Sequence, residues 1–123
     1  MTIAFWCVFV AALLPYVPFG FASTKLDPHA PRLGAPALQG LAARAYGAHL
    51  NGFEAFPFFA AAVIVSHVVE GANATVGWFA VAFVVARLAH MAFYLTDRQP
   101  LRSACFFVGL ALTAVIFIHP AFH

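Results

Sequence analysis

The sequence has little charge. Its 123 residues include only six Lys and Arg and four Asp and Glu, so 8% of the chain is charged whereas 64% is hydrophobic. Soluble globular domains carry about 25% charged residues, and these proportions therefore exclude that class. The formal net charge of +2 is also too small to indicate a nucleic-acid-binding protein.

Cysteine is scarce as well. Cys7 and Cys105 both fall within apolar stretches, which excludes a disulfide framework and a cysteine-based metal site and predicts two packing residues. His67, His119 and His123 lack a recognisable ligand spacing, so no metal site is predicted. There are no internal repeats and no low-complexity segments.

What the chain has in abundance is long apolar runs. A membrane-spanning helix needs about 20 mostly apolar residues, and the sequence contains four such stretches. The first lacks a basic segment before it and a small-residue cleavage site, so it is predicted to be a helix and not a removable signal peptide. We therefore expect an all-α integral membrane four-helix bundle, a single domain over residues 1–123, with helices at about 3–22, 37–69, 76–96 and 101–118.

Prolines and one loop interrupt this pattern. Pro15 and Pro18 lie late in the first run and should kink it or end it early, and Pro57 should bend the second helix. The segment Ser23–Pro36, STKLDPHAPRLGAP, reads as a loop. Loops of this length are often lids or binding segments, and a disordered link is the alternative.

Basic residues occur in two places. Lys25, Arg32 and Arg44 lie in or just after the first connection, and Arg98 and Arg102 lie around the third. The second connection and both termini have no Lys or Arg. The positive-inside rule then places connections one and three in the cytoplasm and both termini on the opposite side. Lys25 and Arg98 are also consistent with ordinary basic residues at the membrane edge, whose charged groups extend toward water.

Polar residues within the apolar runs form two stripes. At 100° per residue, each set lies within about 80° around its helix. The stripe on the second helix contains Arg44, Asn51 and Glu54 together with Gly47 and Phe58, and that on the third contains Arg87, His90, Tyr94 and Arg98. Both stripes lie at a similar depth, because the second helix leaves the cytoplasmic face and the third returns to it.

The stripes are therefore expected to meet. Glu54 is the natural counter-ion for Arg87, and Arg102 adds a cation at the start of the fourth helix. Two interpretations remain open for Asn51, Glu54 and Arg87: a ligand site, or polar contacts that hold helices together. Taken alone, His90 fits a satisfied interior histidine, and His49 points about 140° away from Arg44, toward a subunit or lipid interface.

A cavity lined by these cations suits an anionic, amphipathic ligand. Guanidinium groups bind carboxylates, and a tyrosine hydroxyl or an arginine stabilises a thiolate. A soluble anion would enter from the cytoplasm and a lipophilic molecule from the bilayer.

Two segments, Arg44–Phe59 and Arg87–Ser103, resemble the MAPEG family, the membrane-associated proteins in eicosanoid and glutathione metabolism. Arg44–Phe59, RAYGAHLNGFEAFPFF, resembles the family's second-helix motif, with Asn51, Glu54 and Pro57 at the family spacing. Arg87–Ser103, RLAHMAFYLTDRQPLRS, resembles the end of its third helix and the start of its fourth. The first segment is more similar to bacterial members, which implies a bacterial inner-membrane protein.

The resemblance implies a homotrimer that binds glutathione between adjacent subunits near the cytoplasmic side. It implies that the site is lined by Arg44, Asn51, Glu54, Arg87, His90, Tyr94 and Arg102. Arg102 would be the catalytic residue that stabilises the thiolate, and Tyr94 would contact the tripeptide. At Gly47 the chain departs from the eicosanoid synthases, which have a second arginine there that contacts glutathione.

The expected function is a glutathione-dependent transferase or peroxidase-like activity on lipophilic electrophiles or lipid hydroperoxides. One alternative is a non-catalytic membrane protein whose polar cluster holds the trimer and whose cleft binds lipid. Another is a different thiol or anionic cofactor in the same cleft, which would account for Gly47.

Overall fold

The computed structural model describes residues 1–123 and contains only helices. The long helices are α1 (Ile3–Leu13), α2 (Tyr16–Ser23), α4 (Gly40–Glu70), α5 (Ala74–Leu95) and α6 (Gln99–Ile118). Short elements are α3 (Pro31–Gly34) and the 3-10 turns η1 (Ala35–Ala37) and η2 (His119–Phe122). Four spans, Ile3–Ser23, Gly40–Glu70, Ala74–Leu95 and Gln99–Phe122, are long and apolar enough to cross a membrane. The predicted all-α, four-span class is confirmed.

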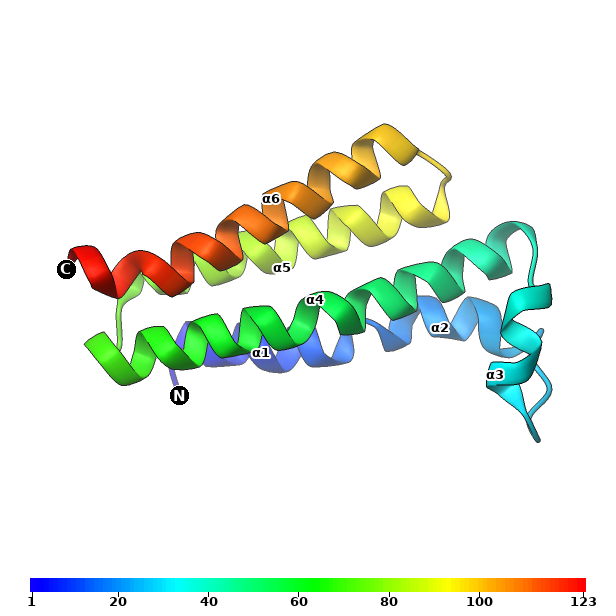
Figure 1. Cartoon of the computed structure of the whole chain (residues 1–123), viewed down its shortest axis with the longest axis horizontal. Helices are drawn as coiled ribbons and strands as arrows, with labels where there is room; N and C mark the ends of the chain where they lie inside the picture. The colour runs from blue at the N-terminus through cyan, green and yellow to red at the C-terminus, as the bar shows by residue number, and fades with distance from the viewer.

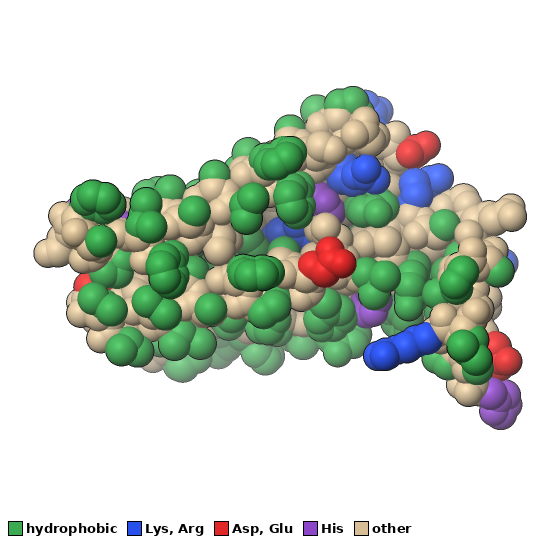
Figure 2. Space-filling model, in the orientation of Figure 1, with side chains coloured by type: hydrophobic (Ala, Val, Ile, Leu, Met, Phe, Trp, Pro, Cys, Tyr) green, Lys and Arg blue, Asp and Glu red, His purple; other side chains and the backbone are tan.

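The four spans run side by side along one axis (Figure 1). The α1 and α2 segments pack along α4, and α5 and α6 form a hairpin beside them. Both termini lie at one end, whereas α3 and the α5–α6 connection lie at the other, hereafter the α3 end. The Lys and Arg side chains visible in Figure 2 lie between the middle of the bundle and the α3 end. The two basic connections therefore share one end, as the charge pattern predicted.

The first span is broken at Pro15, so the predicted kink is confirmed. Pro15 has no N–H to donate to Ala11, and Pro18 has none to donate to Leu14, so the helix separates into α1 and α2. His49 of α4 donates from Nδ1 to the Pro15 carbonyl at 2.7 Å. Its ring also packs against Phe19, with 4.7 Å between ring centroids. His49 thus holds the kink within the protomer, and a place at a subunit interface remains a prediction.

The kink packs on α4 because Gly52 has no side chain. A Cβ at Gly52 would lie 2.7 Å from Pro15 Cγ and 3.0 Å from Pro15 Cβ. Deeper in the bundle, Phe59 of α4 stacks on Phe83 of α5, with ring centroids 3.8 Å apart. Alanines surround this pair in the buried core: Ala4, Ala11, Ala62 and Ala80. In lipid no hydrophobic effect drives helices together, so their association depends on close van der Waals packing. Small residues permit this packing because they let the helix backbones approach closely.

The α4 helix is longer than a bilayer core. Its 31 residues span roughly 46 Å at 1.5 Å per residue, against about 30 Å of hydrocarbon. It continues through Pro57 without ending. It begins at Gly40 and not near Ala37, because Gln39 is extended and Gly40 has a φ of 58°. The preceding segment, read as a loop from sequence, contains the single turn of α3 and η1.

At the end that carries both termini, the Glu70 carboxylate accepts hydrogen bonds from three side chains. Ser66 donates to its Oε1 at 2.8 Å, Asn73 donates to Oε2 at 3.2 Å, and His119 Nδ1 donates to both oxygens at 3.0 and 3.1 Å. These bonds attach η2 to the end of α4. His119 therefore has a structural partner that the sequence pattern did not indicate, and no group of three or more His, Cys, Asp or Glu side chains is arranged to hold a metal ion.

The contact between Gly52 and Pro15 leads to a stability prediction. Gly52→Ala should place a methyl group into the Pro15 ring and lower the free energy of unfolding by about 1–3 kcal/mol, the usual cost of overpacking. Gly20→Ala on α2 is the matched control, because a Cβ there meets nothing within 4 Å. Thermal unfolding in detergent compares the two variants, and equal unfolding temperatures would contradict the close packing at the kink.

Candidate ligand site near one end of the bundle

A polar cavity lies between α4, α5 and α6 toward the α3 end. It has a volume of about 280 Å³. Its lining residues are Asn51, His90, Tyr94, Arg102, Ser103, Phe106 and Phe107. Four of these, Asn51, His90, Tyr94 and Arg102, belong to the seven residues expected from the sequence, so the structure brings together residues up to 51 positions apart in the chain.

Arg102 supplies the cation of this cavity. Its guanidinium carbon lies 4.4 Å from the centre of the Tyr94 ring, a cation–π contact. Its side chain makes no hydrogen bond within the protomer, unlike Arg44 and Arg87. The guanidinium N–H groups of Arg102 are thus available to an anion in the cavity.

His90 lies in the wall of the same cavity and is only 3% exposed. Its ring meets Tyr94 edge to face, with 5.6 Å between centroids. Its Nδ1 atom is buried and has no hydrogen-bond partner. A buried polar atom without a partner is costly, and most are paired in native proteins. Within the protomer, Nδ1 of His90 therefore lacks the hydrogen-bond partner that a satisfied interior histidine would have.

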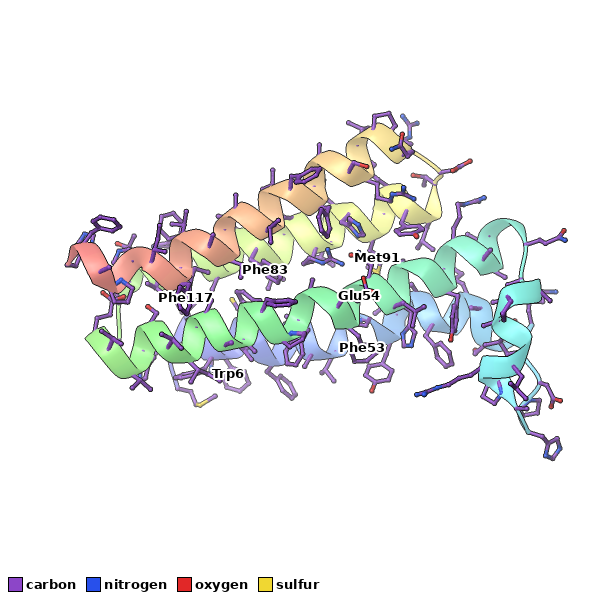
Figure 3. All side chains as sticks on the ribbon, viewed as in Figure 1. Trp6, Phe53, Glu54, Phe83, Met91 and Phe117 are labelled. Atoms are coloured by element: carbon purple, nitrogen blue, oxygen red, sulfur yellow. The ribbon has the colours of Figure 1, made fainter.

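The predicted pair between Glu54 and Arg87 is not formed. Arg87 is 8% exposed, and its Nη2 donates to Asn51 Oδ1 at 2.7 Å. Glu54 lies nearly one turn beyond Asn51 and is exposed at the surface of α4 (Figure 3). The only ion-pair contact in the protomer joins Glu70 to His119. Asn51 takes the place of the expected carboxylate because it, and not Glu54, faces α5 at the level of Arg87.

Glu54 and Arg87 instead line a second cavity of about 170 Å³ beside the first. The two cavities share Phe106. The rest of the second cavity is mostly apolar, and its lining is completed by Ala55, Phe58, Phe83, Gly109, Leu110 and Thr113. An apolar crevice next to the polar cavity suits the lipophilic part of an amphipathic ligand.

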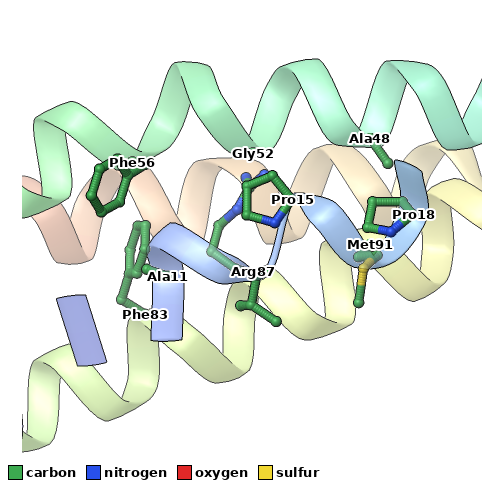
Figure 4. A pocket seen from close by; sticks show the side chains of 10 residues that line it. Ala11, Pro15, Pro18, Ala48, Gly52, Phe56, Phe83, Arg87 and Met91 are labelled. Atoms are coloured by element: carbon green, nitrogen blue, oxygen red, sulfur yellow. The ribbon is translucent and has the colours of Figure 1, made fainter. Parts of the chain in front are cut away.

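Arg87 also borders a small space under the kink, which Figure 4 shows between α1, α4 and α5. Its volume of about 20 Å³ is close to that needed for one water molecule. Pro15, Gly52 and Met91 are among its walls. The guanidinium is therefore enclosed by protein on this side and reaches the second cavity on the other.

Arg44 lies apart from both cavities. Its Nε donates to the carbonyl of Leu95 at 3.3 Å, so it binds the C-terminal end of α5. Cations at a helix C-terminus stabilise its free carbonyl groups. Of the seven expected residues, the structure thus gathers four in the first cavity, places Glu54 and Arg87 at the second, and assigns Arg44 to a helix end.

Ser103, Phe106 and Phe107 line the first cavity but were not singled out from the sequence. The helical period could have indicated two of them. Phe106 follows Arg102 by four residues and Ser103 by three, which places these side chains on one face of α6. The many phenylalanines in the chain obscured this signal.

The fold and the cavities define a class: an integral membrane four-helix protein with a polar cavity near one end and a second, mostly apolar cavity beside it. A scan against protein-family models matches the MAPEG family over residues 3–122, nearly the whole chain. The chain belongs to the MAPEG family, the membrane-associated proteins in eicosanoid and glutathione metabolism. Searches of curated proteins and of solved structures each found no match.

The hydrogen bond between Asn51 and Arg87 leads to a second prediction. Asn51→Leu should leave a buried guanidinium without its partner and lower the free energy of unfolding by about 1–3 kcal/mol. The double variant Asn51→Leu/Arg87→Met removes both polar groups and should recover part of that loss. Chemical unfolding in mild detergent measures both, and a double variant less stable than Asn51→Leu would contradict this account.

Proposed function

We propose that this protein is a glutathione-dependent transferase or peroxidase-like enzyme that acts on lipophilic electrophiles or lipid hydroperoxides. The observation that supports the proposal is the polar cavity lined by Arg102, whose guanidinium makes no hydrogen bond to the protein. This group suits an anion. Membership of a family associated with glutathione metabolism supports glutathione as that ligand.

The proposed role of Arg102 is to stabilise the glutathione thiolate. A nearby cation lowers the pKa of a thiol and so increases the amount of nucleophile at neutral pH. In the transferase reaction the thiolate sulfur forms a bond to an electrophilic carbon, and the leaving group departs with its electron pair. Asn51, His90 and Tyr94 would position the tripeptide through hydrogen bonds.

The peroxidase reaction uses the same thiolate. Its sulfur attacks one oxygen of the hydroperoxide, the O–O bond breaks, and the alcohol leaves after taking a proton. A second glutathione then reduces the resulting sulfenic acid, which yields glutathione disulfide and water. The hydroperoxide is reduced and two glutathione molecules are oxidised, so the electrons balance.

The apolar crevice supports a lipophilic second substrate. It lies next to the polar cavity and shares Phe106 with it, so a molecule from the bilayer would reach the thiolate without crossing water. Glutathione would enter from the α3 end. In this proposal connections one and three face the cytoplasm of a bacterial inner membrane, in agreement with the positive-inside rule.

A homotrimer is part of the proposal. Glu54 is exposed on the protomer within a membrane-spanning helix and has no ion-pair partner there. A carboxylate in contact with lipid is strongly disfavoured. A neighbouring subunit that covers Glu54 would also enclose the second cavity, which Glu54 lines.

A second candidate function rests on the same polar residues. The bond from Arg87 to Asn51 joins α5 to α4, as expected for residues that hold helices together. Gly47 also provides no cation where the eicosanoid synthases have an arginine. A non-catalytic protein whose cleft binds lipid, or one that binds another thiol or anionic ligand, would share these features.

Glutathione binding is the first test. Calorimetry with detergent-purified protein at low salt should detect binding at millimolar glutathione or below. The same sample should then conjugate glutathione to a generic aromatic electrophile. Binding without turnover would favour a non-catalytic protein, and no binding at millimolar glutathione would overturn glutathione as the ligand.

Arg102→Ala should reduce conjugation by roughly a hundredfold, because the thiolate loses its cation, and it should leave the oligomer intact. Arg98→Ala is the matched control, since Arg98 is exposed and lines neither cavity. Turnover and native mass spectrometry are measured on both variants. Loss of the oligomer in Arg102→Ala would contradict a catalytic role for this residue.

Glu54→Ala should weaken assembly, because the proposed contact between subunits would lose its carboxylate. Glu54→Gln, which keeps the shape and hydrogen-bonding capacity, should retain more of the oligomer. Light scattering after size-exclusion chromatography measures the oligomeric state. Trimers of unchanged stability in Glu54→Ala would place Glu54 outside the interface.

A further inference from the structure

Gly47 lies in the interior of α4, where glycine weakens a helix relative to alanine. Its surroundings explain its presence. A Cβ at this position would lie 2.8 Å from Cζ of Tyr94 and 3.1 Å from its Cε1, and would overlap the hydroxyl oxygen. Real Cβ atoms essentially never approach other heavy atoms so closely. The tip of the Tyr94 ring therefore rests directly on the α4 backbone.

Tyr94 is also held by Arg102. The guanidinium carbon of Arg102 lies over the ring at 4.4 Å from its centre, and both side chains line the polar cavity. The ring is thus fixed by the α4 backbone at its tip and by a cation on its face. A side chain at position 47 would therefore have to displace the tip of the Tyr94 ring, over whose face Arg102 lies.

We propose that Gly47 is a positioning residue of the ligand site. By having no side chain it lets Tyr94 lie against α4, and through the cation–π contact this sets the position of the Arg102 guanidinium in the cavity. The proposal rests on the proposed function for its ligand, a thiol, but the contact between Gly47 and Tyr94 is present without any ligand.

The packing of Tyr94 against Gly47 also determines which group a ligand contacts near position 47. The space that a side chain at 47 would occupy is filled by Tyr94, so the ligand meets a phenol there. Arg44 is hydrogen-bonded to Leu95 and Arg87 to Asn51, which leaves Arg102 as the cation that lines this cavity without a protein hydrogen bond. The protomer therefore offers the thiolate one well-placed cation, whose position depends on Gly47.

The experiment is a double-mutant cycle with a matched control. Gly47→Ala, Tyr94→Ala and the combined variant are compared with the unchanged protein, and Gly20→Ala serves as a helical glycine with nothing within 4 Å of its Cβ. Gly47→Ala should lower the unfolding temperature, whereas the same change in the Tyr94→Ala background should not. Gly20→Ala should leave the unfolding temperature unchanged or raise it.

The second measurement is ionisation of bound glutathione, followed by the ultraviolet absorbance of the thiolate against pH. Gly47→Ala should raise the pH of half-ionisation by about one unit, because Arg102 moves away from the sulfur. In the Tyr94→Ala background, Gly47→Ala should add nothing further. A purely structural role for Gly47 would lower stability and leave this ionisation profile unchanged.

The outcomes separate the two proposals. If the unchanged protein binds no glutathione, the proposed ligand is wrong, and the unfolding temperatures alone decide whether position 47 is coupled to Tyr94. If glutathione binds but Gly47→Ala leaves the thiolate profile unchanged, the positioning role is overturned while the proposed function stands. Equal effects of Gly47→Ala in the presence and absence of Tyr94 would overturn it as well.

Discussion

The buried guanidinium of Arg87 is the constraint on which the polar end of this bundle depends. A charge in the low-dielectric interior of a membrane protein is very unfavourable unless polar groups surround it. Asn51 provides the hydrogen bond, and small residues let the long side chain lie between helices, with Gly109 of α6 close to its Cδ. The pairing joins α4 to α5 where the two cavities begin, so the same contact that permits the charge also shapes the site.

Glycines and prolines then set the distances between helices. Pro15 divides the first span, and Gly52 lets the kink approach α4 closely. Gly47, five residues earlier on α4, admits the Tyr94 ring in the same way. Both contacts use the absence of a side chain on α4, one toward α2 and one toward α5. The helix that is longest in the bundle is therefore also the surface against which the neighbouring elements are positioned.

The two ends of the bundle use polar residues differently. At the end with both termini, Glu70 is paired with Ser66, Asn73 and His119 and leaves no free acceptor for a ligand. At the α3 end, the Arg102 side chain lines a cavity without a hydrogen-bonded partner, and the buried Nδ1 of His90 also has none. The first arrangement joins η2 to α4, whereas the second leaves the Arg102 guanidinium without a protein acceptor. An anion would therefore find a free cation at the α3 end and none at the other end.

The sequence by itself determined the membrane class, the four spans, the kink at Pro15 and the depth at which polar residues gather, because hydrophobic length and helical period are local properties of the chain. It also indicated Asn51, His90, Tyr94 and Arg102 as neighbours. Only the tertiary structure decided which polar groups touch. Asn51 and not Glu54 meets Arg87, Arg44 binds a helix end, and Gly47 makes room for Tyr94. Helical period gives the direction of a side chain to within tens of degrees, but a hydrogen bond requires a heavy-atom distance near 3 Å, which depends on how closely the helices pack.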